Sequence, residues 1–275
     1  MITKQSHPRH AVFPPSALWL PQTWCRLMSI TTRFKCSWAH FEITSNCNLA
    51  CVYCAVSQPW YQGTNLDEDR AQAVSDWLLK NNVPNINING HGETTIVKGW
   101  TKIIKPLLAS SARCHIITNA AKSFSQEELE TLSKLNSITI SCDTFDAALY
   151  ASLRRKSQLR NVLDAIAKIR DAARRLSRKP PKFILSCVLG AENSPSLEEF
   201  ILNARCMDIR SIQLCSLTEY PFPPDTDFKL NPLSTLSKPE LTRLNNILAT
   251  YSAIEDGFLN IHPGILTEIQ DSLAC

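Results

Sequence analysis

Glycine is scarce in this chain, and long apolar stretches are missing. Only 7 of the 275 residues are Gly while 44% are hydrophobic, so the sequence has enough apolar surface to build a core. No apolar run approaches the roughly 18 residues that a membrane-spanning helix requires, so we expect no membrane partner. The formal net charge of +4 is mild and does not demand a nucleic-acid partner. The length fits one large α/β domain or two small ones.

Acidic residues are absent from the first 41 positions, although basic ones occur there. An acid-poor N-terminus is typical of organelle transit peptides, which form an amphipathic helix. Four prolines would interrupt such a helix here: Pro8, Pro14, Pro15 and Pro21. We therefore favour a poorly structured N-terminal extension over residues 1–36.

A disulfide framework is also missing, although the chain contains 11 cysteines. Their number is odd, and outside residues 47–54 their spacing lacks the paired pattern that small secreted domains use. This usage indicates a reducing compartment, and we predict a cytoplasmic location.

Three of the cysteines lie within eight residues, at Cys47, Cys51 and Cys54. Thiolates this close in sequence can converge on one soft metal centre. A structural zinc site needs a fourth Cys or His, and the nearest candidates are Cys36 and His40. Iron–sulfur clusters are also held by thiolates, and three thiolates would leave one iron of a cubane open to a ligand. The spacing alone thus allows a zinc-stapled binding module without catalysis or a reactive iron–sulfur centre.

Six predicted strands alternate with predicted helices from residue 37 onward. Short apolar or alternating runs predict strands at 37–44, 85–89, 114–118, 137–142, 182–189 and 211–217. Helical periodicity and capping boxes predict helices at 67–81, 97–109, 125–135, 158–176, 196–207 and 238–254. Alternation of this kind indicates βαβ units and a parallel sheet, which is either open or curled into a barrel. In both architectures ligands bind at the carboxyl ends of the strands.

The cysteine spacing resembles the C-x-x-x-C-x-aromatic-C signature of the radical S-adenosylmethionine (SAM) superfamily, with Tyr53 at the aromatic position. The resemblance implies a partial (β/α)6 TIM-like barrel over residues 37–220, followed by a Pro-rich turn and helical segment over 221–275. It also implies that Cys47, Cys51 and Cys54 hold one [4Fe–4S] cluster whose open iron is chelated by SAM. In that family an electron from the cluster cleaves SAM to methionine and a 5′-deoxyadenosyl radical.

Several residues at predicted strand ends resemble the SAM-binding positions of the family. Gly90, Gly92 and Glu93 follow the second strand, where relatives carry a Gly-Gly-Glu motif that holds the SAM amino group; His91 and Thr94 depart from the commoner pattern. The other positions that the resemblance implies are Ser141 and Asp143 for the SAM ribose, Arg154 or Arg155 for the SAM carboxylate, and Asn119 and Asn193 as further SAM contacts. A local turn bond explains each Asn equally well from the residues alone.

The substrate is not specified by these features, because fold and cofactor do not determine it. We expect hydrogen-atom abstraction from a peptide, a small metabolite or nucleotide, or RNA, with a peptide or small molecule favoured over RNA. The resemblance implies an electron donor such as a flavodoxin or ferredoxin. Residues after 217 contain no second cysteine cluster, which predicts a single cluster.

Overall fold

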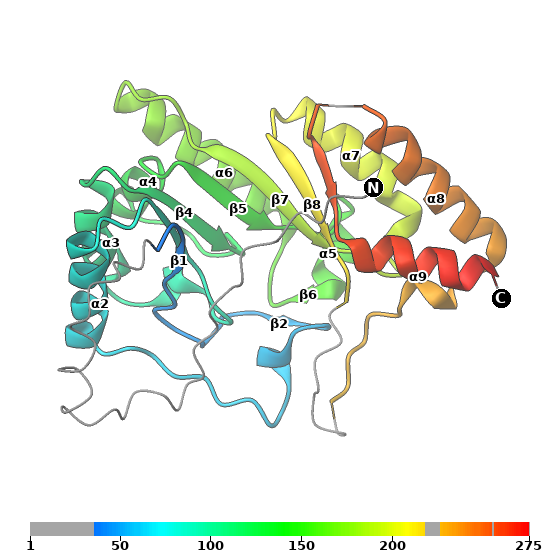
Figure 1. The fold of residues 1–275 in the computed structure, drawn as a ribbon, viewed down its shortest axis with the longest axis horizontal. Helices are drawn as coiled ribbons and strands as arrows, with labels where there is room; N and C mark the ends of the chain where they lie inside the picture. Colours follow the sequence, from blue (N-terminus) through cyan, green and yellow to red (C-terminus); the bar gives the residue numbers. More distant parts are fainter. Residues whose placement is uncertain (1–35, 218–225, 255, 275) are drawn as a thin grey trace, which may run out of the picture. The chain divides into compact units, whose positions relative to one another are not determined.

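A seven-stranded parallel sheet forms the centre of the computed structural model, which describes residues 36–217, 226–254 and 256–274 (Figure 1). The predicted extension up to Lys35 and the turn with Pro221, Pro223 and Pro224 lie outside these residues. The strands of this sheet are β1 (Ala39–His40), β3 (Asn85–Ile88), β4 (Arg113–Thr118), β5 (Ser137–Ser141), β7 (Lys182–Val188), β8 (Ser211–Cys215) and β9 (Leu259–Ile261).

The strands lie side by side in sequence order, β1-β3-β4-β5-β7-β8-β9, and every neighbouring pair is parallel. Among the described residues, β1 and β9 stand at the two edges and do not pair with each other, so the sheet does not close. This agrees with the predicted parallel, partial-barrel architecture. Because the strands are parallel and adjacent, their carboxyl ends lie along one edge.

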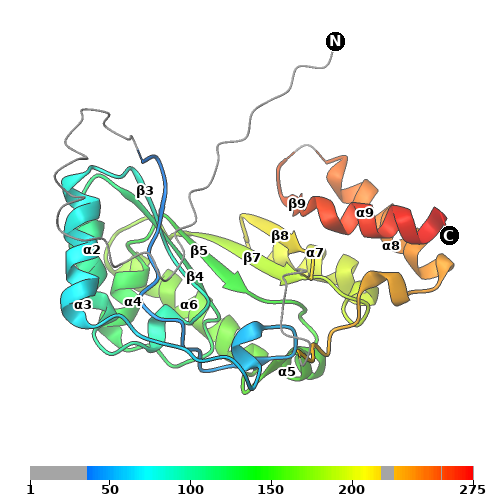
Figure 2. The same ribbon diagram turned by 60° about the horizontal axis from the view of Figure 1, so that its bottom comes forward.

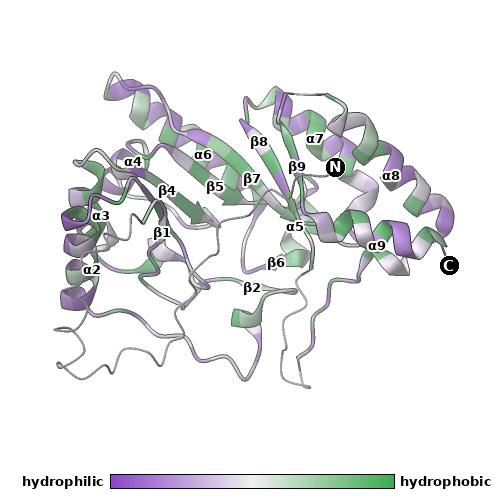
Figure 3. Cartoon of the chain, viewed as in Figure 1, coloured by the Kyte–Doolittle hydropathy of each residue, from purple (hydrophilic) through white to green (hydrophobic). Residues whose placement is uncertain are grey.

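Helices connect the strands and lie beside the sheet (Figures 1 and 2). They are α2 (Glu68–Lys80), α3 (Trp100–Leu108), α4 (Gln126–Leu132), α5 (Ala147–Leu153), α6 (Leu159–Arg175), α7 (Leu197–Cys206), α8 (Lys238–Ser252) and α9 (Pro263–Ala274), with the 3-10 turns η1 (Ala55–Ser57), η2 (Thr94–Ile96), η3 (Ser194–Ser196) and η4 (Leu233–Thr235). Their apolar sides and the strands form one hydrophobic core, as the green strands and two-coloured helices of Figure 3 illustrate. Ile104, Ile138 and Ile166 are among its buried members.

All six predicted strands are present, but several elements differ from the sequence expectation. The first strand is only Ala39–His40, because the chain leaves the β3 ladder after Phe41. The Ser125–Glu128 capping box is present, whereas the one expected at Ser196 is wrong. The Ser196 hydroxyl instead donates to the Asn193 carbonyl in a 3-10 turn. Helices α5 and α9 and strand β9 were not predicted as separate elements; α5 has 7 residues and β9 has 3, whereas α9 has 12.

A second, two-stranded sheet holds the cysteine loop. β2 (Ala50–Cys51) pairs antiparallel with β6 (Arg154–Arg155), so that Cys51 lies opposite Arg154. Val52, beside β2, forms a small apolar cluster with Leu153 and Leu230. The loop is therefore attached to the connection after β5 as well as to the strand that precedes it.

Residues 36–275 cluster as one compact unit, and the predicted boundary near residue 220 falls between β8 and β9 of the same sheet. Strand β9 bonds to β8, and Leu233, Leu241 and Ile265 belong to the same core as the strands. Within the described residues, no helix has the length and apolar character needed to span a membrane.

Candidate active site

Three free thiols gather in the loop that follows β1. Cys47, Cys51 and Cys54 are unpaired, and the side chains are close enough for Cys54 and Cys47 to raise the pKa of the Cys51 thiol. Burial is the larger cause and brings the pKa of Cys51 to about 12; burial likewise raises the pKa of Cys47. The Cys47 and Cys51 thiols are thus protonated at neutral pH without a metal, and a metal that binds them must displace their protons.

A fourth thiol or imidazole ligand is absent from this loop in the described part of the chain. The Cys36 thiol donates to the Trp38 carbonyl, and the His40 ring bonds to Asn89, so both predicted zinc candidates are engaged elsewhere. Across the described residues, no three His, Cys, Asp or Glu side chains are gathered as ligands of one metal ion. This arrangement does not fit a single zinc ion. It fits a cubane, in which each thiolate binds its own iron and the sulfurs stand farther apart.

The turn after β3 packs directly against the backbone that leads into Cys47. A Cβ on Gly92 would lie 2.3 Å from the Asn46 carbonyl oxygen and 2.5 Å from that of Thr44, so only Gly fits. The Glu93 N–H donates to the same Asn46 carbonyl at 2.8 Å. The Gly-x-Gly-Glu turn and the cysteine loop therefore form one structural unit.

The Glu93 side chain is a buried anchor between strand ends. Its carboxylate accepts hydrogen bonds from the Thr118 hydroxyl at 2.8 Å, from the Asn119 N–H at 2.6 Å and from Thr95. Only 3% of Glu93 is exposed. These bonds hold the carboxylate in place, with three of them on Oε1 and one on Oε2, and its contact with the SAM amino group stays a prediction. Backbone groups of the turn are also candidates for that contact.

Asn119 lies at the end of β4 beside the cysteine loop. Its side-chain Nδ2 donates to Asn48 Oδ1 at 2.8 Å and lies 3.7 Å from Cys47 Sγ. Its Oδ1 accepts from the Ala121 N–H, which is the local turn bond that Asn typically forms. The sequence expectation that Asn119 belongs to the site region agrees with this position, and its contact with SAM stays a prediction.

Asp143, after β5, forms the centre of a buried polar network. Its carboxylate accepts from the Tyr53 hydroxyl at 2.6 Å and from the Val188 N–H at 2.9 Å, and it pairs with the Arg154 guanidinium through Nε at 2.8 Å and Nη2 at 3.0 Å. These contacts do not support the predicted ribose contact of Asp143, because both oxygens are committed to the protein. The Ser141 hydroxyl, in contrast, forms no hydrogen bond to another described residue and remains available.

Arg154 and Arg155 have different surroundings, which the sequence could not distinguish. Arg154 is 5% exposed, and its Nη1 lies 3.9 Å from Cys51 Sγ as a hydrogen-bond donor. Arg155 is exposed. The guanidinium of Arg154 therefore faces Cys51 and Asp143, and its contact with the SAM carboxylate stays a prediction.

Asn193 holds the turn after β7. Its Oδ1 accepts from the Gly190 N–H, and its Nδ2 donates to the backbone carbonyls of Asp143 and Val188. The side chain is buried and satisfied, so the turn explanation accounts for it and the predicted SAM contact gains no support. It links the ends of β5 and β7.

Two further groups support the loop and were missed by the sequence. Gln58 bonds through both ends of its amide to the backbone of Asp227, at 3.1 and 3.0 Å. Glu42 accepts from the His91 N–H at 2.6 Å; its contact with the ring raises the pKa of His91, and His91 lowers the pKa of Glu42. Neither pairing has a local sequence signal, because the partners lie 49 or more residues apart.

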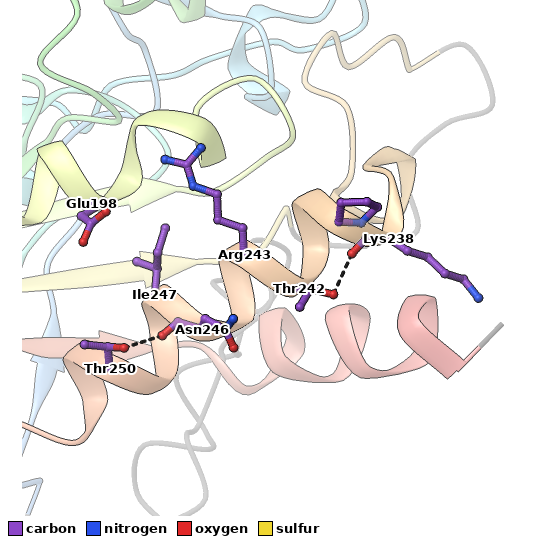
Figure 4. A pocket seen from close by; sticks show the side chains of 8 residues that line it. Glu198, Lys238, Thr242, Arg243, Asn246, Ile247 and Thr250 are labelled. Atoms are coloured by element: carbon purple, nitrogen blue, oxygen red, sulfur yellow. Dashed lines mark hydrogen bonds between the residues drawn. The ribbon is translucent and has the colours of Figure 1, made fainter.

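A groove with a volume of about 700 Å³ lies elsewhere, between α7 and α8 (Figure 4). Glu198, Arg243 and Asn246 line it, and none of the predicted site residues does. The hydroxyls of Thr242 and Thr250 donate to carbonyls of their own helix. This groove is therefore separate from the cysteine loop.

The Radical SAM superfamily family model matches residues 41–201, which is more than half of the 275-residue chain. The chain belongs to the radical SAM superfamily. Enzymes of this superfamily use a [4Fe–4S] cluster and SAM, so the chain is a radical SAM enzyme. The match includes the cysteine loop and the strand ends from β3 to β7. The family assignment gives no support to the alternative of a non-catalytic zinc module.

Known proteins agree with the family and the fold. A GTP 3′,8-cyclase from Mycolicibacterium smegmatis is 26% identical over 169 residues, which make up 58% of this chain and 45% of that protein. The structure of Streptococcus suis SuiB bound to S-adenosylmethionine superposes with a TM-score of 0.63 at 16% identity. The matched region covers 82% of this chain and 50% of the SuiB chain. The anSMEcpe enzyme with bound AdoMet has a TM-score of 0.59 at 13% identity, covering 82% and 64%. The chain thus spans about half the length of the first relatives that it matches.

Proposed function

We propose that this radical SAM enzyme binds a single [4Fe–4S] cluster through Cys47, Cys51 and Cys54 and abstracts a hydrogen atom from a substrate. The observation that carries the proposal is that three free thiols lie in one loop, whose preceding segment packs against Gly92 and Glu93 of the turn after β3. The described residues supply no further Cys or His from Cys36 or His40, because both are engaged elsewhere. When bound, the cluster supplies an electron that cleaves SAM, and the resulting 5′-deoxyadenosyl radical removes the substrate hydrogen.

The chain's own residues would bind and orient SAM at the ends of the strands. Gly90 and Gly92 lie in the turn after β3, and Gly92 packs against the segment that leads into Cys47. Backbone groups of this turn are therefore suited to receive the SAM amino group. The free Ser141 hydroxyl suits a ribose hydroxyl. Glu93 and Asn119 would act by holding the turn and the loop in place, as their internal hydrogen bonds indicate.

Uncharged polar side chains next to this region favour a substrate that hydrogen-bonds without carrying phosphate. The strand register aligns Ser141, Ser186, Gln213 and Asn260 in one row across β5, β7, β8 and β9. Their neighbours along the strands face the core, so this row faces the opposite side of the sheet, where Gln213 and Asn260 are exposed. Such groups pair well with peptide amides, whereas phosphates favour Arg and Lys. We therefore favour a peptide or small neutral metabolite over a nucleotide or RNA.

The test is anaerobic reconstitution of the full chain with iron and sulfide, followed by incubation with SAM and dithionite. We expect about four iron atoms per chain and 5′-deoxyadenosine in the products. Candidate peptides and, in parallel, nucleoside triphosphates are then tested for faster 5′-deoxyadenosine formation and for a changed mass. Tight zinc binding without iron uptake would contradict the proposal, and stimulation by nucleoside triphosphates alone would contradict the favoured substrate class.

A further inference from the structure

Arg154 has one guanidinium nitrogen that does not face its carboxylate partner. Nε and Nη2 face the Asp143 carboxylate at 2.8 and 3.0 Å, while Nη1 donates toward Cys51 Sγ at 3.9 Å. Arg154 and Asp143 are 5% and 2% exposed, so water screens this arrangement little. The ion pair thus presents its positive side to one of the three thiols proposed to hold the cluster.

Two further contacts keep the guanidinium in this place. The Tyr53 hydroxyl donates to Asp143 at 2.6 Å, and the Arg154 guanidinium carbon lies 5.5 Å from the centre of the Tyr53 ring. In addition, β2 and β6 pair so that Cys51 and Arg154 are direct neighbours. Buried Arg–carboxylate pairs are costly to desolvate and are weak evidence for stability. The Arg154–Asp143 pair beside Cys51 is therefore better explained by a role other than stabilising the fold.

We infer that Arg154 raises the reduction potential of the cluster and that Asp143 limits this increase. Reduction adds one electron to the cluster, supplied by a one-electron reductant, and breaks no bond in the protein. The added negative charge is stabilised by a cation and an N–H donor at a ligand sulfur. Arg154 Nη1 lies 3.9 Å from Cys51 Sγ, whereas the Asp143 carboxylate contacts the other two nitrogens of the same guanidinium. This inference rests on the proposed function, since it needs the cluster to bind at Cys51.

The sign of the potential change separates this role from a merely structural one. R154M removes the cation and should make reduction harder, whereas D143N removes the opposing anion and should make reduction easier. If the pair served only to stabilise the loop, both variants would lower the melting temperature of the cluster-free protein. The reduction potential of the reconstituted protein would then not shift in opposite directions in the two variants. R155M is the matched control, because Arg155 is the exposed neighbour.

The experiment is a potentiometric titration of the reconstituted full-length protein, followed by the EPR signal of the reduced cluster. For R154M we expect the ratio of reduced to oxidised cluster at a fixed potential to fall about tenfold. For one electron this corresponds to a reduction potential about 59 mV lower than that of the wild type. D143N should shift in the opposite direction, and R155M should match the wild type. An unchanged potential in R154M, or a shift of the same sign in both variants, would overturn the inference.

If R154M takes up no cluster, D143N and R154K carry the test, because both keep a cation beside Cys51. D143N must then titrate at a higher potential than the wild type, and R154K must stay close to it; D143N at or below the wild-type potential overturns the inference. A wild-type protein that binds no cluster would refute the proposed function itself. A wild type that binds the cluster and cleaves SAM, without the opposite shifts in the variants, would refute only the role of Arg154.

Discussion

Replacing Gly92 with Ala should separate the cysteine loop from the turn that supports it. The added Cβ would stand 2.3, 2.5 and 2.6 Å from Asn46 O, Thr44 O and Ser45 C, all of which are backbone atoms. No side chain can rotate to relieve these contacts. Either the turn or the segment before Cys47 must therefore move.

The size of the effect follows from two contributions. Forcing a methyl group into a packed site typically costs about 1–3 kcal/mol. The hydrogen bond from the Glu93 N–H to Asn46 O would lengthen as well, and a bond of this type contributes about 1 kcal/mol. We expect G92A to lose about 2–4 kcal/mol of unfolding free energy in the cluster-free protein and to bind less iron.

Gly90 provides the matched control, because its added Cβ would meet the Glu42 side chain instead of backbone. In denaturant titrations of the cluster-free protein, G90A should lower the free energy of unfolding in the wild-type background. The double variant G90A/E42A should be about as stable as E42A, because E42A removes the side-chain atoms that the added Cβ meets. The G92A loss should persist in the E42A background. If G92A is as stable as the wild type and reconstitutes normally, the close packing of the turn against the loop is refuted.

Three more predictions concern separate parts of the molecule. Changing any one of the three loop cysteines to Ser should abolish iron binding, whereas C36S should retain it; iron loss in C36S would implicate a fourth ligand. Q58A removes both bonds to Asp227, so hydrogen exchange at the Asp227 amide should accelerate about five- to thirty-fold, as a 1–2 kcal/mol loss implies. Burial raises the pKa of Glu128, but bonds from Lys122, the Ser125 amide and Trp100 outweigh it, and the net pKa is lowered below 4.5. Its stabilisation is thus present above pH 4.5 and lost as the pH falls through the lowered value, so the stability gap between wild type and E128Q should close in acid; a gap that widens would contradict this sign.

Local sequence patterns predicted the features that depend on neighbouring residues. The period of α6, the alternation in β3 and the Ser125–Glu128 capping box of α4 all involve contacts within one or two turns or strands. The cysteine loop was predictable for the same reason, because its three thiols are held close by chain connectivity alone. The position of the site at the strand ends followed from the parallel order of the sheet.

Contacts between distant segments were not predictable. Asp143 reads as a free carboxylate at a strand end, and only the fold brings Tyr53 and Arg154 to it from other elements. The Glu93 carboxylate likewise accepts hydrogen bonds from Thr118 and Asn119, which lie next to it because β3 and β4 are neighbours in the sheet. Strand β9 has only three residues, too few for their alternation to predict a strand, so its pairing with β8 depends on the tertiary packing of α8 and α9.

The claim on which the account depends is that the three thiols leave one iron open and that SAM occupies it. The direct measurement is pulsed EPR of the reduced, reconstituted protein with SAM labelled by 15N in its amino group. We predict a hyperfine coupling between the label and the cluster spin, together with a change of the cluster signal on adding SAM. A four-iron cluster whose signal SAM leaves unchanged, with no coupling to the label, would contradict the account.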